Sequence, residues 1–305
     1  MSTTTTISAG RRLALVGVAL AVYVAVGGLL LVSLASLGSP GVGGGGAIFG
    51  ERIALVELEG VIVDVEELVR ELKGHRDNPA VRAVVIRINS PGGVVAPTQE
   101  LHTALRRLRE AGKPVVASLG AVAASGGYYV AVAADRIYAN PGTLTGSIGV
   151  IMQLANVHDL LKKVGVDYVV VKAGQYKDIG SFARPMTPEE RRVLQTLLDD
   201  VHGQFIAAVA AGRKLERSQV VQFADGRIVS GGQAKALGMV DALGGLEEAI
   251  DGAATLAGLP KPPRVVGPRR KFSVVDLLRS ELGGGGLGVF RPSLPLFSTP
   301  LYLMD

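Results

Sequence analysis

The sequence predicts an α/β fold with a mainly parallel sheet. Short runs rich in valine and isoleucine, bounded by Gly, Pro or Asn, recur between residues 51 and 265 and have the character of buried parallel strands. Segments with helical signals alternate with these runs, which is the order of repeated βαβ units. The 305 residues contain enough Val, Leu, Ile and Ala for a large core, although tryptophan is absent.

Strands and helices are expected to alternate along this body. The expected strands are 53–58, 83–88, 115–119, 136–139, 148–154 and 168–171. The expected helices are 65–73, 98–111, 127–134, 156–164, 188–213 and 230–237. The helix at Pro188 has the clearest start, because Thr187 can cap it and Glu189 and Glu190 lie at the positive end of its dipole.

An uncharged run of 25 residues, 13–37, precedes the body. As a helix it would be roughly 37 Å long, which is enough to cross a bilayer with some tilt. Arg11 and Arg12 stand just before it, so the positive-inside rule predicts a cytoplasmic segment 1–12 and an extracytoplasmic body. A cleaved signal peptide is the alternative interpretation, although its apolar region is usually shorter, about 7–15 residues.

Glycine-rich and proline-rich segments flank the body, which is expected at 51–265. The glycines within 38–50 predict a flexible linker. Segment 266–305 is expected to contain a short amphipathic helix, 273–282, and then an extended tail, because prolines recur from residue 292 onward. This tail could pack on the domain or on a neighbouring subunit. Our sharper hypothesis is that it occupies a peptide-binding groove as a self-substrate or regulator.

Composition excludes several classes of function. The net charge of +5 comes from basic residues scattered among acidic ones, which does not indicate a nucleic-acid surface. Cysteine is absent, so disulfides and thiolate chemistry are excluded. The four histidines lack metal-ligand spacing and there is no Walker A sequence, so no metal, ATP or other cofactor is expected.

Two glycine-rich corners carry the candidate chemistry. Ser125 is followed by two glycines, and it is either a nucleophile or only the N-cap of the next helix. The second corner, Asn89-Ser90-Pro91-Gly92-Gly93, follows an expected strand, at the sheet edge where α/β proteins bind ligands. The N–H groups of Gly92, Gly93 and Gly126 are candidate oxyanion donors, although a tight turn explains the glycine pair equally well.

Several motifs, taken in order, resemble the signal peptide peptidase A family. They are 89–93, 123–129, 145–150 (Thr-Gly-Ser-Ile-Gly-Val), 174–178 (Gly-Gln-Tyr-Lys-Asp), 186–191, 224–228 and 239–244. The resemblance runs from about residue 53 to about residue 250, and the length is similar to the short form of the family, which has one catalytic domain. It implies a crotonase/Clp-protease-like fold and a membrane-anchored serine protease.

The resemblance also implies residue roles. The nucleophile falls on Ser125, the general base on Lys177, and a serine that hydrogen-bonds the base on Ser147. A lysine amine must be neutral to accept a proton, and desolvation favours the neutral form. We therefore expect Lys177 to be buried and Asp178 to point away from it.

The family further implies what the protein acts on and how it assembles. The implied substrates are remnant signal peptides and other short apolar peptides near the membrane. The implied assembly is a ring of subunits in which Ser125 and Lys177 come from adjacent protomers.

Three alternatives remain at the level of sequence. A histidine could replace lysine as the base, as in Clp-type relatives, and His158 is the best placed of the four. The crotonase fold also supports acyl-CoA chemistry, which the predicted extracytoplasmic location opposes. A membrane scaffold without activity is the third, and the presence of Ser125, Ser147 and Lys177 opposes it.

Overall fold

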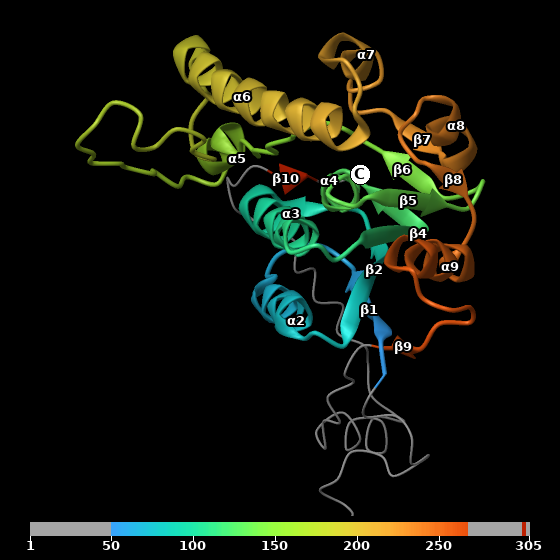
Figure 1. The fold of residues 1–305 in the computed structure, drawn as a ribbon. Coiled ribbons are helices and arrows are strands. Elements are labelled where there is room, and N and C mark those ends of the chain that lie inside the picture. The colour runs from blue at the N-terminus through green and yellow to red at the C-terminus, as the bar shows by residue number, and fades with distance from the viewer. Residues whose placement is uncertain (1–49, 268–300, 303–305) are drawn as a thin grey trace, which may run out of the picture. The chain divides into compact units, whose positions relative to one another are not determined.

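The computed structural model describes residues 50–267 and 301–302 (Figure 1). The predicted membrane span, 13–37, and the predicted helix, 273–282, lie outside these residues. Among the helices that the structure does describe, none is both long and apolar enough to cross a membrane.

A mixed, mostly parallel sheet forms the centre of the body, which confirms the predicted α/β class. Its order is β7-β6-β4-β2-β1-β9, while β5 pairs with β4 and with β8. The β6–β7 pair is antiparallel and the other pairs of this sheet are parallel. The strands are β1 (Arg52–Glu59), β2 (Val81–Ser90), β4 (Val115–Ala124), β5 (Arg136–Ala139), β6 (Leu144–Gly146), β7 (Ile228–Ser230), β8 (Ala242–Leu243) and β9 (Val265–Val266).

Helices pack on both faces of this sheet (Figure 1). Alternate residues of β1 belong to different core clusters: Ala54 and Val56 to one, and Ile53 to the cluster that contains Ala253 of α9. Alternation of this kind follows from the period of two along a strand. The helices are α2 (Glu66–Asp77), α3 (Val95–Glu110), α4 (Gly126–Ala131), α5 (His158–Lys163), α6 (Pro188–Arg213), α7 (Arg217–Val221), α8 (Gly231–Ala236) and α9 (Leu246–Ala257).

The start of α6 confirms the predicted cap. The Thr187 hydroxyl accepts a hydrogen bond from the Glu190 N–H at 3.2 Å, and a Glu190 carboxylate oxygen accepts one from the Thr187 N–H at 2.9 Å. This reciprocal capping box satisfies two N–H groups that a helix start otherwise leaves unpaired.

Two predicted strands are wrong. Segment 168–171 forms no strand, and its side chains are exposed, up to 96% at Val171. Segment 148–154 contains only an isolated bridge residue, Ile151. Both runs are rich in β-branched residues, but a strand also needs a hydrogen-bonding neighbour, and neither run has a ladder partner among the residues that the structure describes.

A second, two-stranded sheet lies beside the glycine corner. Strand β3 (Gly93–Val94) pairs antiparallel with β10 (Leu301–Tyr302), in the register Leu301 with Val94 and Tyr302 with Gly93. Gly93 also forms a parallel bridge with Ile62. A short piece of the tail that the sequence predicts to be extended is therefore a strand next to Gly93.

Candidate active site

Ser125 occupies a strained backbone position between β4 and α4. Its φ is 52° and its ψ is −119°. Among the described residues the non-glycine positions with positive φ are Ser125, Ser147 and Lys214. Such conformations cost about 1–3 kcal/mol and concentrate at functional sites. Two of these three are therefore the serines that the sequence motifs single out.

The Ser125 hydroxyl is buried without a hydrogen-bond partner. Ser125 is 0% exposed. Among the described residues, its Oγ is the one buried side-chain oxygen or nitrogen without a hydrogen-bond partner. The N-cap alternative predicts that this oxygen accepts a hydrogen bond from a backbone N–H at the start of α4, but no such bond is present. An unpaired buried hydroxyl is costly, about 1–3 kcal/mol, and in a folded protein it calls for a functional explanation.

The glycines bring the two corners into contact. A Cβ at Gly127 would lie 2.7 Å from the Ser90 carbonyl oxygen, and one at Gly93 would lie 2.0 Å from the Ile62 carbonyl oxygen. A Cβ at Gly126 would lie 3.2 Å from the Gly93 nitrogen. Larger residues cannot allow these approaches without backbone shifts, so glycine is required for close packing around Ser125.

One proposed oxyanion donor already has a partner. The Gly92 N–H donates to the Ser90 Oγ at 3.1 Å, so this donor is engaged in the structure, and its oxyanion role stays a prediction. Gly126 is the first residue of α4, where helix geometry provides no partner for the N–H. Gly126 is therefore the candidate donor that the helix leaves without a partner, whereas Gly93 is paired with Tyr302 of β10 in the structure.

Ser147 lies beside Ser125 at the end of the neighbouring strand. In the parallel β4–β6 pair Ala124 is opposite Gly146, and each of the two serines is the next residue. The Ser125 N–H donates to the Gly146 carbonyl at 2.8 Å, and the Ser147 N–H donates to the Arg227 carbonyl at 2.8 Å. The structure thus brings together two of the three predicted catalytic residues.

Lys177 lies in an exposed turn in the segment between α5 and α6, which extends away from the sheet (Figure 1). The interactions found for the described residues include none between Lys177 and Ser125. The expected burial of Lys177 is therefore wrong for a single subunit. The Asp178 carboxylate accepts a hydrogen bond from Arg184 Nε at 2.8 Å and also pairs with Lys172.

His158 lies on a helix, as expected, and a second histidine lies nearer to the serine corner. His158 Nδ1 lies 2.8 Å from the Ala183 carbonyl, at the start of α5. His202 Nε2, on α6, lies 3.2 Å from the carbonyl of Ile148, the residue after Ser147. Nothing in the sequence indicated that His202 lies near the serine corner, because His202 is more than 50 residues further along the chain than Ile148.

The chain exposes many apolar side chains around the Lys177 turn. Between residues 160 and 182 they include Val169 at 80% exposure and Val171 at 96%. We call this set the exposed apolar segment: Leu160, Val164, Val166, Tyr168, Val169, Val170, Val171, Tyr176 and Phe182. Exposed apolar groups that are concentrated in this way mark interaction surfaces in soluble domains.

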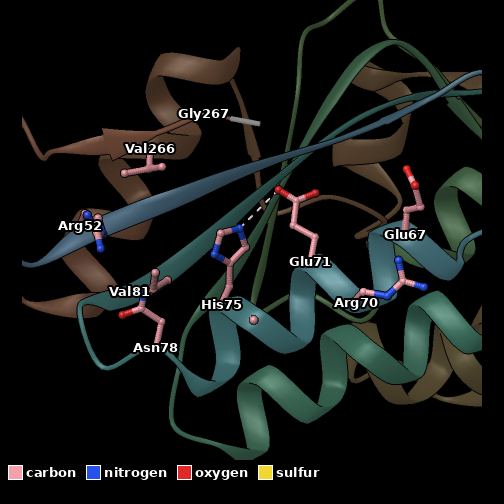
Figure 2. A pocket seen from close by; sticks show the side chains of 10 residues that line it. Arg52, Glu67, Arg70, Glu71, His75, Asn78, Val81, Val266 and Gly267 are labelled. Atoms are coloured by element: carbon pink, nitrogen blue, oxygen red, sulfur yellow. Dashed lines mark ion pairs between the residues drawn. The ribbon is translucent and has the colours of Figure 1, made fainter. Parts of the chain in front are cut away.

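A pocket of about 850 Å³ lies elsewhere (Figure 2). It is lined by Arg52 and Val81, the first residues of β1 and β2, and by the ion-paired His75 and Glu71 of α2. Ser125 instead follows the last residue of β4, which runs parallel to these strands. The pocket therefore lies at the amino ends of the strands, whereas Ser125 lies at their carboxyl ends, and the pocket lining includes none of the predicted site residues.

Comparison with known proteins decides the family. The sequence profile of peptidase family S49 matches residues 107–260, which include both strained serines and Lys177. The chain belongs to peptidase family S49. The S49 match also covers α6 and α9, so it extends well beyond the serine corner.

Curated relatives agree with this assignment. A putative protease of Synechocystis is 49% identical over 210 residues, which cover 68% of this chain and 76% of the relative. A putative signal peptide peptidase SppA of Enterococcus faecium is 34% identical over 214 residues, which cover 66% and 62% of the two chains. Protease 4 of Salmonella typhi is 37% identical over 219 residues, which cover 69% of this chain but 35% of that protein.

The resemblance to the signal peptide peptidase A family is thereby confirmed. The family and the names of the relatives support a protease.

Proposed function

We propose that this S49 peptidase is a membrane-anchored serine endopeptidase that uses Ser125 as its nucleophile and Lys177 as its general base. The single observation that carries the proposal is the strained, fully buried and unpartnered Ser125 hydroxyl in a glycine-lined corner. The proposed fold is of the crotonase/Clp-protease type, because the candidate residues follow the carboxyl ends of parallel strands.

The proposed reaction is acyl transfer. The Ser125 Oγ attacks the scissile carbonyl carbon while its proton moves to the neutral Lys177 Nζ, and the N–H groups of Gly93 and Gly126 hold the oxyanion. The tetrahedral intermediate collapses, the C–N bond breaks, and Lys177 returns the proton to the leaving amine. Water then attacks the acyl-enzyme with the same base, and Ser125 is released. Ser147 orients the amine by accepting its hydrogen bond.

A second copy of the chain is proposed to complete this site. Ser125 is 0% exposed whereas Lys177 is exposed, and the exposed apolar segment surrounds the lysine turn. Association through this segment would desolvate Lys177, and desolvation favours the neutral amine that the reaction needs. The proposed assembly is a ring in which adjacent protomers contribute Ser125 and Lys177, so an isolated subunit would be inactive.

The proposed substrates are extended apolar peptides, signal-peptide remnants among them. Strand β3 lies next to the serine corner and accepts β10 as an antiparallel neighbour, which is how an extended peptide adds to a sheet edge. Tail residues 301–302 are thus proposed to occupy the position of a substrate as a self-substrate or regulator. Truncation at Leu282 should raise activity on added peptides, and unchanged activity and self-processing would contradict this role.

The predicted span at 13–37 gives the proposed location. The chain would be held in the cell membrane with its catalytic domain on the extracytoplasmic side, near peptides released into the bilayer. Protease accessibility of the catalytic domain in intact cells, compared with lysed cells, tests this orientation.

Labelling with an active-site-directed serine probe tests the nucleophile. The assembled protein should be labelled, Ser125→Ala should not be, and Ser218→Ala, at an exposed position in α7, should label normally. Lys177→Ala should lose both labelling and peptidase activity, whereas His158→Ala should keep them. Absence of labelling in an assembled wild-type sample would favour the inactive scaffold, and full activity of Lys177→Ala would exclude the dyad.

A further inference from the structure

The Lys177 turn is held by polar contacts rather than by apolar packing. Its backbone bonds are local: Lys177 N–H to the Gly174 carbonyl at 3.2 Å, and Ile179 N–H to the Tyr176 carbonyl at 3.1 Å. Residues 174–177 are exposed, so the core does not fix the turn. A catalytic base at this position therefore needs another anchor.

The residue after Lys177 provides the first half of that anchor. The Asp178 side chain is only 12% exposed and accepts a hydrogen bond from Arg184 Nε at 2.8 Å. The Asp178 carbonyl accepts a second bond from Arg184 Nη2 at 3.3 Å. Hydrogen bonds from Arg184, and then from Lys172, hold the pKa of the Asp178 carboxyl well below its usual range. Arg184 thus holds both the side chain and the backbone of the residue next to Lys177.

The other side of the Arg184 guanidinium reaches α6. Its Nη1 donates to a Glu190 carboxylate oxygen at 2.9 Å, and its Nη2 pairs with the other oxygen. Glu190 is 4% exposed and closes the capping box with Thr187. The helix is itself fixed, because Phe205 and Val209 further along it are fully buried. Arg184 therefore links an exposed turn to an element anchored in the core.

From this geometry we infer that Arg184 is a positioning residue for Lys177, acting through Asp178. The planar guanidinium forms a fork with five N–H donors, which lets one side chain hold two carboxylates and a carbonyl at once. A lysine has a single ammonium group and cannot reproduce this bridge. Arg184 and Lys172 are the ion-pair partners of the Asp178 carboxylate in the structure. The inference rests on the proposed role of Lys177.

Three substitutions test the inference in the full-length, assembled protein. Arg184→Ala should lower kcat on the order of 10²-fold, since small displacements of a catalytic group cost this much, while KM changes little. Addition of methylguanidine should restore part of the activity, which it would not do for a folding defect. Arg184→Lys should fall between the wild type and Arg184→Ala. The matched control is Arg192→Ala on α6, whose side chain is 74% exposed and pairs only with Glu189 among the described residues.

The outcomes separate this inference from the function on which it rests. Full activity of Lys177→Ala would contradict the proposed Ser125–Lys177 dyad itself. Loss of activity in Lys177→Ala, together with a kcat within twofold of wild type in assembled Arg184→Ala, would overturn only the positioning role. If Arg184→Ala fails to assemble, Asp178→Asn provides the second test, because it removes the charge that Arg184 binds and keeps one acceptor. An Asp178→Asn kcat equal to wild type would likewise overturn the inference.

Discussion

The serine corner and the lysine turn are built in opposite ways. Ser125 is 0% exposed and is surrounded by backbone that approaches within distances only glycine permits. Lys177 is exposed, and its turn depends on the Asp178–Arg184–Glu190 ion pairs and is surrounded by exposed apolar side chains. Folding of a single chain is thus enough to bury the serine corner, whereas the lysine turn and the apolar side chains around it stay exposed in one subunit.

This difference suggests where each half can fail. Changes at the serine corner should affect stability and activity together, because the corner is part of the core. Changes at the lysine turn should affect activity or assembly while leaving the subunit folded. The following experiments test that separation.

Mixing two inactive variants tests whether adjacent subunits share a site. Ser125→Ala and Lys177→Ala should each lower activity by a factor on the order of 10³ or more. Dissociated and reassembled together in equal amounts, they should recover about one quarter of wild-type activity, since a heterologous interface then unites an intact serine with an intact lysine at that frequency. Peptidase assays before and after mixing measure this. No recovery in fully reassembled rings would place both residues in one subunit.

Gly127→Ala tests the close packing of the serine corner. The new Cβ would lie 2.7 Å from the Ser90 carbonyl oxygen, so the backbone must move, at a cost of about 1–3 kcal/mol in the free energy of unfolding. Activity should fall with stability. In contrast, Gly74→Ala lies within helix α2 with no neighbour within 4 Å, and it should stabilise by about 0.5–1 kcal/mol. Chemical denaturation of both variants would contradict this account if Gly127→Ala were the more stable.

Val171→Asp tests the exposed apolar segment. Val171 is 96% exposed, so the substitution should change the free energy of unfolding of one subunit by less than about 0.5 kcal/mol. A charge at an interface should nevertheless prevent association and abolish activity. Val221→Asp, at 52% exposure on α7, is the matched control and should assemble normally. Analytical ultracentrifugation reads out the result, and an intact, active assembly of Val171→Asp would show that this segment is not the interface.

Glu190→Gln tests the anchor of the lysine turn through its pH dependence. Hydrogen bonds from Arg184 and then from the Thr187 backbone lower the pKa of Glu190 from 4.5 to about 2. Because the pKa is lower in the folded state, the ionised Glu190 stabilises the fold at any pH above its unfolded-state pKa of 4.5. This contribution is lost as the pH falls from 4.5 towards 2. The difference in unfolding free energy between wild type and Glu190→Gln should therefore be constant near neutral pH and decrease below pH 4.5. A stability difference between wild type and Glu190→Gln that stayed constant from pH 7 down to pH 2 would contradict the assignment.

Sequence patterns predicted the sheet and the serine corner well, for a physical reason. Residues 83–88 are mostly buried and rich in valine and isoleucine, residues 115–119 are fully buried, and the two segments lie within β2 and β4 respectively. The helix at 188–213 matches α6 because its cap is encoded locally by Thr187 and Glu190. Elements whose signal is local were therefore predictable.

Segments whose conformation depends on a partner were not predicted. Segment 168–171 has the composition of a strand but lacks a ladder partner among the described residues. The Gly92 donor was expected to be free, yet the hydroxyl of Ser90, two residues earlier, accepts its hydrogen bond. Neither outcome is visible in composition or periodicity, because each depends on which groups the fold places nearby.

By itself, the sequence determined the α/β class, the motif resemblance and the identity of Ser125, Ser147 and Lys177 as candidates. Residue types and their order along the chain are enough for those conclusions. Tertiary structure alone decided that Ser125 is strained and unpartnered, that Ser147 is its neighbour, and that Lys177 is exposed and tied to α6 through Arg184. Burial, backbone strain and long-range ion pairs arise only when distant segments pack together, and that is why they could be read from the fold and not from the chain.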